Sequence, residues 1–208
     1  MKEIEYFYSA HSAFAYLGSA RLMAIAAASG RRIAHKPVDL NSVVAEAGSA
    51  AFGRRSKAHV AYFFRREIER WSEERSAPWI GRIPTHHAND FTLPNCMLIA
   101  GLTLGLDVDR LAHALLEAHW RDDADLADRS ALAAIGQGVG LDSTPLLDVA
   151  LSGPVLAIYQ ANTKEAIGRS VFGSPTYFVD RDMFYGQDRL DMVERAVRRP
   201  YAGSWPRD

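Results

Sequence analysis

Four residues near the start of the chain, Ser9-Ala10-His11-Ser12, have the types and spacing for acid–base or anion-binding chemistry. They follow an apolar segment at residues 4–8 and directly precede a helical pattern at residues 13–29. The first turn of a helix presents unpaired backbone N–H groups and the positive end of the helix dipole, and both favour an anion. Serine is also a favoured N-cap residue. Ser12 is therefore either an ordinary helix cap or a hydroxyl group that stabilises a bound anion.

Two further polar segments lie near the end of the chain. Gly173-Ser174-Pro175-Thr176 precedes an aromatic run at residues 177–179 with the composition of a strand, and the proline marks the start of that strand. If the bond before Pro175 is cis, the N–H and C=O of Ser174 can pair with an extended peptide. Gly186-Gln187-Asp188-Arg189 then leads into an amphipathic helix, which Asp188 is placed to cap. Together these segments predict a ligand cradle.

The elements that must position these residues follow from the apolar pattern. Residues 4–8 and 32–40 have the composition of strands, and a helix is expected between them at 13–29. A helical segment that ends near residue 170, strands at 177–179 and 183–185 and a final helix complete the second half. This order resembles a thioredoxin-like domain.

The middle of the chain has helical periodicity and few β-branched runs. Helices are expected at residues 58–74, 93–105, 108–121 and 130–139, with proline and glycine breakers between them. The predicted fold class is therefore α/β, a thioredoxin-like domain (residues 1–41 and 153–208) with a large α-helical insertion (residues 42–152).

Cysteine usage argues against redox chemistry by the protein itself. Redox members of this fold open the first helix with a Cys-x-x-Cys pair, whereas this chain has Ser9 and Ser12 there. The one cysteine, Cys96, lies in an apolar helical segment, where a core thiol is expected. A single cysteine forms no intramolecular disulfide, so thiol–disulfide exchange by the chain's own residues is not expected.

The composition limits which binding partners and which cellular compartment we expect. A net charge of −1 gives no electrostatic basis for binding nucleic acid. There is no apolar run of 18 residues and the start of the chain enters a strand directly, so we expect no membrane segment and a cytoplasmic protein. We expect no metal site, because the adjacent His86 and His87 would point apart and the acidic cluster at residues 122–128 lacks the glycine and glutamate of a calcium loop.

The segments YFYSAHSAFAYLGS (6–19), NTKEAIGRSVFGSPTYFVD (162–180) and FYGQDRLD (184–191) resemble the 2-hydroxychromene-2-carboxylate isomerase family. That family is a glutathione-dependent branch of the DsbA-like and kappa-class glutathione transferase group, and the resemblance covers nearly the whole chain. The chain departs from the family at Ala13, where a proline is usual, at Arg181-Asp182 in the hairpin, and at Tyr185 in place of a tryptophan.

The resemblance implies glutathione as the cofactor and a set of residues that hold it. Ser12 would donate its hydroxyl hydrogen to the glutathione sulfur, with Ser9 as its main competitor; His11 either polarises the sulfur or substrate or is an exposed turn residue. Ser174, beside Pro175, would pair with the cysteinyl backbone, and Asp188 would bind the γ-glutamyl ammonium or simply cap its helix. Lower-ranked candidates for polar contacts with glutathione are Gln187, Asn41, Asn162, Lys57 and Arg54, of which the last two are better explained as solvated surface charges.

The implied reaction converts 2-hydroxychromene-2-carboxylate to trans-o-hydroxybenzylidenepyruvate, so the expected partner is a small aromatic carboxylate. Aromatic walls would suit this flat substrate, and Phe7, Phe14, Tyr16 and Tyr185 are candidates, although such side chains are often core. Relatives often form homodimers, and the resemblance extends that expectation to this chain. Two alternatives stay open: a kappa-class-like glutathione transferase or peroxidase, and a non-catalytic DsbA-like protein that binds peptides.

Overall fold

The computed structural model describes residues 2–48, 54–203 and 205. In these ranges a four-stranded mixed sheet has the strand order β2-β1-β3-β4. β1 (Glu3–Tyr8) pairs in parallel with β2 (Arg32–Pro37) and antiparallel with β3 (Thr176–Val179), which pairs antiparallel with β4 (Asp182–Tyr185). The predicted strands are confirmed, except that the second one ends at Pro37 and residue 40 already starts a helix.

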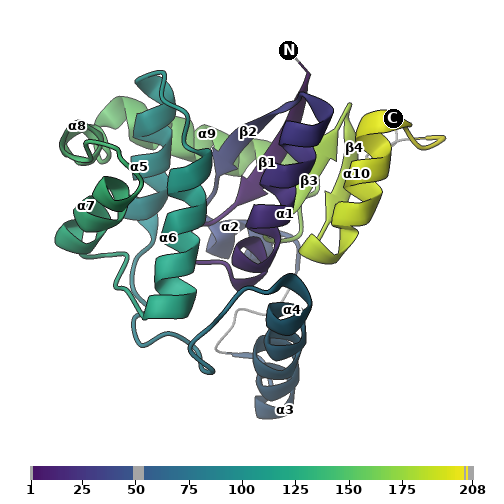
Figure 1. Ribbon diagram of the computed structural model, residues 1–208, viewed down its shortest axis with the longest axis horizontal. Coiled ribbons are helices and arrows are strands. Elements are labelled where there is room, and N and C mark those ends of the chain that lie inside the picture. Colours follow the sequence, from purple (N-terminus) through teal and green to yellow (C-terminus); the bar gives the residue numbers. More distant parts are fainter. Residues whose placement is uncertain (1, 49–53, 204, 206–208) are drawn as a thin grey trace.

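Helices cover both faces of the sheet (Figure 1). Because side chains alternate along a strand, Ile4, Tyr6 and Tyr8 face one core with α1 (Ala13–Ser29) and α10 (Leu190–Arg198). Phe7 faces the other way, into a smaller core formed with α2 (Leu40–Glu46) and α9 (Gly153–Gly168). The sheet is thus buried between two layers of helices.

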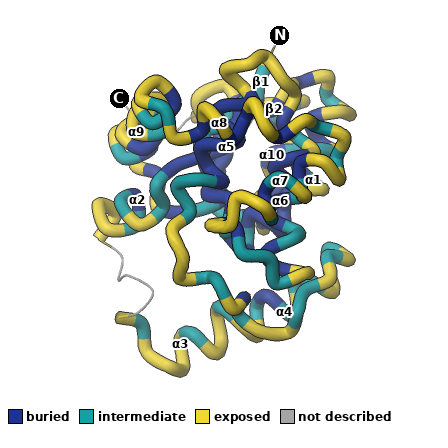
Figure 2. Tube along the Cα trace, turned by 90° about the vertical axis from the view of Figure 1, so that its left-hand side faces the viewer, coloured by how far each residue is buried: buried dark blue, intermediate teal, exposed yellow. Residues whose placement is uncertain are grey.

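The middle of the chain is helical, as expected. The first helical stretch runs as α3 (Lys57–Ala61), the π-helical turn η2 (Tyr62–Arg66) and α4 (Glu67–Arg75), and it projects away from the sheet (Figures 1 and 2). α5 (Thr92–Thr103), α6 (Asp109–Asp122), α7 (Arg129–Gly138) and α8 (Thr144–Val149) follow. The short helices α2 and α8 were not predicted.

The register of the sheet brings the three polar segments to one end. Phe7 of β1 lies opposite Thr176 of β3, which in turn lies opposite Tyr185 of β4. The residues that follow β1, precede β3 and follow β4 therefore lie side by side. The last of them form the single-turn helix η3 (Gln187–Arg189), which opens α10.

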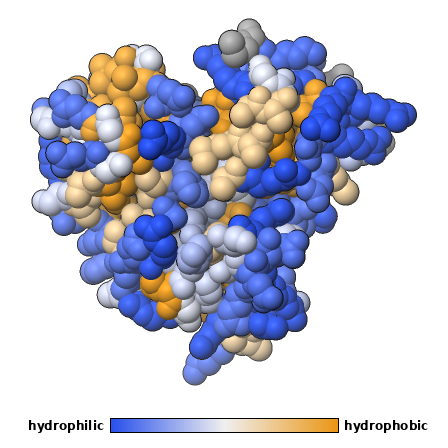
Figure 3. All heavy atoms as spheres, viewed as in Figure 1, coloured by the Kyte–Doolittle hydropathy of each residue, from blue (hydrophilic) through white to orange (hydrophobic). Residues whose placement is uncertain are grey.

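Apolar side chains also reach the surface. In the view of Figure 3 they gather over the upper end of α5, where Leu102, Leu104 and Leu106 are partly exposed. No helix among the described residues has the length and apolar character needed to cross a membrane.

Candidate active site

Ser12 sits at the start of α1, with its hydroxyl group between the helix and the loop before β3. Its Oγ accepts a hydrogen bond from the Ala15 N–H at 3.3 Å and donates one to the Ser174 carbonyl oxygen at 3.3 Å. The expected N-cap is therefore confirmed. Capping uses only a lone pair of the hydroxyl oxygen, so the O–H hydrogen remains for an acceptor, which here is the Ser174 carbonyl.

The loop before β3 is joined to the same turn. The Ser174–Pro175 peptide bond is cis. Ser174 Oγ accepts a hydrogen bond from the Ser9 N–H at 3.3 Å, and the Pro175 carbonyl accepts one from the Gly186 N–H at 2.9 Å. The structure thus brings Ser12, Ser174 and Pro175 together with the turn that leads to Asp188.

Asp188 does not cap the final helix. Within the described residues, no side-chain cap hydrogen bond is made at the start of η3 or of α10, so the expected cap is wrong. The carboxylate instead folds back toward Gly186, where any Cβ would collide with it and where φ is +97°. Only glycine suits that position. Asp188 is exposed and has a loose ion pair with Arg189 at 3.3 Å, which leaves carboxylate lone pairs for a cationic ligand.

The lower-ranked candidates lie in varied surroundings. Gln187 is 2 % exposed, and its Oε1 accepts a hydrogen bond from Arg75 Nε at 3.1 Å. Asn162 donates to the Pro37 carbonyl at 3.2 Å and so ties α9 to β2. The remaining three are exposed: Asn41 lies in the first turn of α2, Lys57 is the first residue of α3, and Arg54 precedes α3. The structure therefore gives Gln187 and Asn162 contacts within the protein.

A buried polar network surrounds the turn before Ser12. Asn95 of α5 is fully buried; its Oδ1 accepts from the Ala10 N–H at 2.9 Å and its Nδ2 donates to Ser9 Oγ at 3.0 Å. Ser9 Oγ lies 2.9 Å from His11 Nδ1. Sequence reasoning did not select Asn95, although a polar residue inside the apolar run of α5 was a signal for such a role.

His11 is not the exposed turn residue considered above. Its ring stacks on Phe91 with 3.6 Å between the ring centres, and its backbone carbonyl accepts a hydrogen bond from Trp120 Nε1 at 2.8 Å. Burial, and then the neighbouring His87 and His119, hold the pKa of His11 well below its usual value. His11 is therefore neutral at physiological pH.

The four aromatic residues proposed as substrate walls separate into two groups. Phe7 and Tyr16 are core residues, at 0 % and 2 % exposure, so the proposal is wrong for both. Phe14, in the first turn of α1, is partly exposed and packs against Phe63 of η2 with 5.0 Å between ring centres. Tyr185 is exposed and lies against Gly173.

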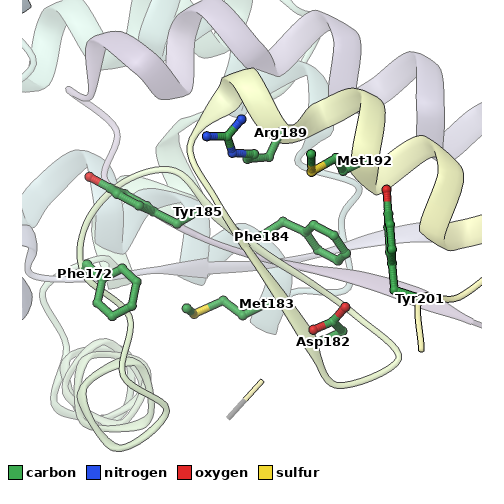
Figure 4. A pocket seen from close by; sticks show the side chains of 8 residues that line it. All are labelled: Phe172, Asp182, Met183, Phe184, Tyr185, Arg189, Met192 and Tyr201. Atoms are coloured by element: carbon green, nitrogen blue, oxygen red, sulfur yellow. The ribbon is translucent and has the colours of Figure 1, made fainter. Parts of the chain in front are cut away.

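A cavity of about 460 Å³ lies against β4, η3 and α10 (Figure 4). Figure 4 shows Phe172 and Tyr185 at one end, Tyr201 at the other and the Arg189 guanidinium above. Its lining comprises Phe172, Asp182, Met183, Phe184, Tyr185, Arg189, Met192 and Tyr201. Ser12, Ser174 and Asp188 are not among these residues, so this cavity is a neighbour of the site rather than part of it.

Cys96 is the buried residue that its sequence context predicted. Its side chain lies in the core of α5, and burial raises the pKa of the thiol to about 12. A thiol with this pKa supplies no thiolate at neutral pH. In the described part of the chain, no group of three His, Cys, Asp or Glu side chains has the geometry of a metal site.

Comparison with known proteins places this geometry in a family. A family model described as a DSBA-like thioredoxin domain matches residues 3–198. The chain belongs to the DSBA-like thioredoxin family. The α/β fold class predicted from the sequence, a thioredoxin-like domain with a helical insertion, is thereby confirmed.

Relatives of this DSBA-like chain agree with the resemblance found in its sequence. It is 26 % identical over 194 residues to a 2-hydroxychromene-2-carboxylate isomerase of Sphingobium xenophagum, which covers 93 % of this chain and 96 % of the relative. A protein of the same name from Pseudomonas sp. strain C18 is also 26 % identical over 194 residues, covering 93 % and 89 %.

Solved structures match the fold along nearly its whole length. A 2-hydroxychromene-2-carboxylate isomerase aligns with a TM-score of 0.77 at 24 % identity, covering 95 % of both chains. The cytosolic disulfide reductase DsbM from Pseudomonas aeruginosa, solved with GSH, aligns with a TM-score of 0.65 at 16 % identity, covering 95 % of this chain and 93 % of DsbM.

Proposed function

We propose that this protein is a glutathione-dependent isomerase that converts 2-hydroxychromene-2-carboxylate to trans-o-hydroxybenzylidenepyruvate. The observation that carries the proposal is the hydroxyl group of Ser12, which lies at the start of α1 and 3.3 Å from the Ser174 carbonyl, in a chain whose one cysteine is buried. The isomerase names of the relatives, over more than 90 % of this chain, support the reaction.

The residues at this end of the sheet fit glutathione by the chemistry of their donors and acceptors. Glutathione carries a thiol, peptide groups, an ammonium and two carboxylates. Ser12 offers a hydroxyl for the thiol, the Ser174 backbone offers peptide groups, and the exposed Asp188 offers a carboxylate for the ammonium. DsbM, which shares the fold, was solved with GSH, and this supports the same cofactor here.

Each of these residues has a distinct task in the proposed reaction. When bound, glutathione would supply a thiol nucleophile, the chemistry needed to open a conjugated double bond reversibly and so permit rotation about it. The Ser12 hydroxyl would donate a hydrogen bond to the sulfur and, together with the positive end of the α1 dipole, would favour the anionic form of that sulfur. To bond the sulfur, the Ser12 hydroxyl would turn its hydrogen away from the Ser174 carbonyl. The hydrogen bond that Ser12 Oγ accepts from the Ala15 N–H would keep the oxygen in place during that turn.

Ser12 suits this task better than Ser9. The Ser9 hydroxyl is 1 % exposed and makes two hydrogen bonds, at 3.0 Å with Asn95 and 2.9 Å with His11, whereas the hydroxyl hydrogen of Ser12 is held by a longer bond of 3.3 Å to the Ser174 carbonyl. Phe14, which follows Ser12 by two residues in the first turn of α1, packs against the exposed Phe63, and this pair offers an aromatic surface for the flat substrate. The π-helical turn η2, which carries Phe63, is a feature found frequently at functional sites.

A kinetic assay tests the proposal. Purified protein is mixed with 2-hydroxychromene-2-carboxylate, and the absorbance of the open-chain product is followed with glutathione, with S-methylglutathione and without either. We expect turnover with glutathione only. Equal turnover without glutathione would refute the cofactor assignment, and conjugation of glutathione to 1-chloro-2,4-dinitrobenzene without isomerisation would favour the transferase alternative.

A further inference from the structure

The hydrogen bonds around Ser9 fix which ring nitrogen of His11 carries the proton. The Ala10 N–H is only a donor, so the Asn95 atom that faces it must be the oxygen, and the Asn95 NH₂ group must donate to Ser9 Oγ. The hydroxyl hydrogen of Ser9 then needs an acceptor, since this side chain is buried. Among the described residues that acceptor is His11 Nδ1, at 2.9 Å.

Neutral histidine has one N–H group and one lone pair on its ring nitrogens. Because Nδ1 accepts from Ser9, the proton of His11 lies on Nε2. A second chain of hydrogen bonds fixes the neighbouring rings: the Ala124 carbonyl accepts from His119 Nδ1 at 3.0 Å, so His119 Nε2 accepts from His87 Nδ1, also at 3.0 Å. The buried histidines on this side are thus neutral rings with assigned tautomers.

The Nε2–H group of His11 is open to a ligand. Within the described ranges it has no hydrogen-bond partner, and the fully buried polar side-chain atoms without a partner there are the hydroxyls of Tyr6 and Tyr177. Nε2 is therefore not fully enclosed, in a side chain that is partly exposed. The ring is held by the stack on Phe91 and by the bond to Ser9, and the backbone beneath it is held by the bond from Trp120 Nε1 to the His11 carbonyl. A donor that is already oriented costs no reorganisation when it is used.

We propose that His11 is a further catalytic residue, which donates a hydrogen bond from Nε2 to the keto oxygen that the substrate, bound beside Ser12, gains when its hemiketal ring opens. The inference rests on the proposed function. When the conjugated carbon–carbon double bond is opened by nucleophilic addition, its electron pair moves onto the keto oxygen, and the pair returns when the nucleophile leaves. Before that addition, ring opening breaks the bond from C2 to the ring oxygen and moves the hemiketal O–H hydrogen onto that oxygen, which becomes the phenol. The whole reaction thus consumes no net proton or electron, and His11 only stabilises the charge on the keto oxygen while it is present.

A neutral ring is the better donor for a reversible step. Burial and the two histidines that face it, His87 and His119, oppose a positive charge on His11. A charged imidazolium would release its proton to the oxygen, whereas a neutral N–H group holds the charge and lets the electron pair return. Neutral histidine acts as an electrophile of this kind in other enzymes.

The first test needs no cofactor. In protein labelled with ¹⁵N-histidine, the long-range ¹H–¹⁵N spectrum reports the tautomer of each ring. We expect His11 in the Nε2–H form in the wild type. In Ser9→Ala, where the donor to Nδ1 is gone, a mixture of the two forms is expected. A wild-type His11 in the Nδ1–H form would overturn the proposal.

The second test is kinetic. His11→Leu should lower kcat about 100-fold, the effect of removing one such donor, while glutathione affinity and the pKa of the bound thiol stay as in the wild type. His11→Gln keeps an N–H donor at a similar reach and should recover at least roughly tenfold of that loss. The control is His86→Leu, a half-exposed histidine that pairs with Asp125, and it should match the wild type.

The outcomes separate the two proposals. If the wild type turns over the chromene with glutathione but His11→Leu keeps its kcat within a factor of about two, against the expected donor effect, the role of His11 is overturned and the proposed function stands. If the wild type binds no glutathione, both fall. Should His11→Leu fold poorly by circular dichroism, the comparison of His11→Gln and Ser9→Ala with the wild type decides the matter, since Ser9→Ala should lower kcat and His11→Gln should stay within roughly tenfold of the wild type.

Discussion

Replacing Asn95 should disturb the candidate site most, although Asn95 is not proposed to contact a ligand. Its amide makes three hydrogen bonds from a fully buried position: with the Ala10 N–H at 2.9 Å, with Ser9 Oγ at 3.0 Å and with the Tyr159 hydroxyl at 3.3 Å. Asn95→Leu keeps a similar volume and removes all three. The backbone donor of Ala10 is then left in the core without an acceptor.

The magnitude follows from these contacts. Three hydrogen bonds at about 1 kcal/mol each give a loss of roughly 3 kcal/mol in the free energy of unfolding. Since a domain of this length shifts its Tm by about 2–4 °C per kcal/mol, a fall of roughly 6–12 °C is expected. The matched control is Asn41→Leu, which changes the same residue type at an exposed position and should stay within about 0.5 kcal/mol of the wild type.

Urea denaturation followed by far-ultraviolet circular dichroism measures both variants, and the midpoints give the difference if the slopes agree. The histidine tautomer of His11 should change along with stability, because Ser9 loses the donor that orients its hydroxyl. A loss below about 1 kcal/mol for Asn95→Leu would refute the reasoning, because it would mean that the buried network contributes little.

Three further predictions concern other groups. Asp188→Asn should weaken glutathione binding about tenfold, roughly 1.4 kcal/mol, in calorimetry, whereas the exposed Asp191→Asn should not; equal affinities would remove Asp188 from the site. Cys96, whose thiol pKa is raised to about 12, should resist iodoacetamide in the folded protein and react after unfolding, and rapid labelling of the native protein would contradict its burial. Burial and His119 lower the pKa of His87 to about 4, so the folded state resists its protonation. The contribution of His87 to the free energy of unfolding should be fully present above the unfolded histidine pKa of about 6.5 and should be lost as the pH falls to about 4, a loss of roughly 3 kcal/mol. In urea titrations at several pH values, His87→Gln should weaken this dependence of the unfolding free energy on pH. An unchanged pH dependence in His87→Gln would argue against the prediction.

Much of the fold could be predicted because the pattern was local. The helix at residues 13–29 begins after a serine cap and ends at Gly30 with φ of +63°, and both signals are visible in the sequence. Strands β3 and β4 were set by their aromatic content and the turn between them. The short helices α2 and α8 were missed, since six or seven residues give little periodicity and tertiary packing decides their form.

The candidate site could be predicted only in part. Ser12, Ser174 and Pro175 were found because turn residues and a family resemblance marked them. His11 and Asn95 lie 84 positions apart in the chain, and their link through Ser9 arises only when α5 packs against the turn after β1. For Asp188 the cap pattern was misleading, because the chain enters α10 through a single turn of a different helix, which leaves the carboxylate outside the capping position. Three-dimensional packing, rather than spacing, decides such cases.

The central claim is that Ser12 turns bound glutathione into a thiolate. Calorimetry of glutathione binding to the wild type and to Ser12→Ala, paired with a pH titration of the ultraviolet thiolate absorbance, tests it most directly. Asp128→Ala serves as the control, because it removes the helix cap of α7, away from the site. We predict that the wild type and the control bind glutathione and lower its thiol pKa, while Ser12→Ala binds it without lowering the pKa. An equal lowering in Ser12→Ala, or no binding by the wild type, would contradict the account.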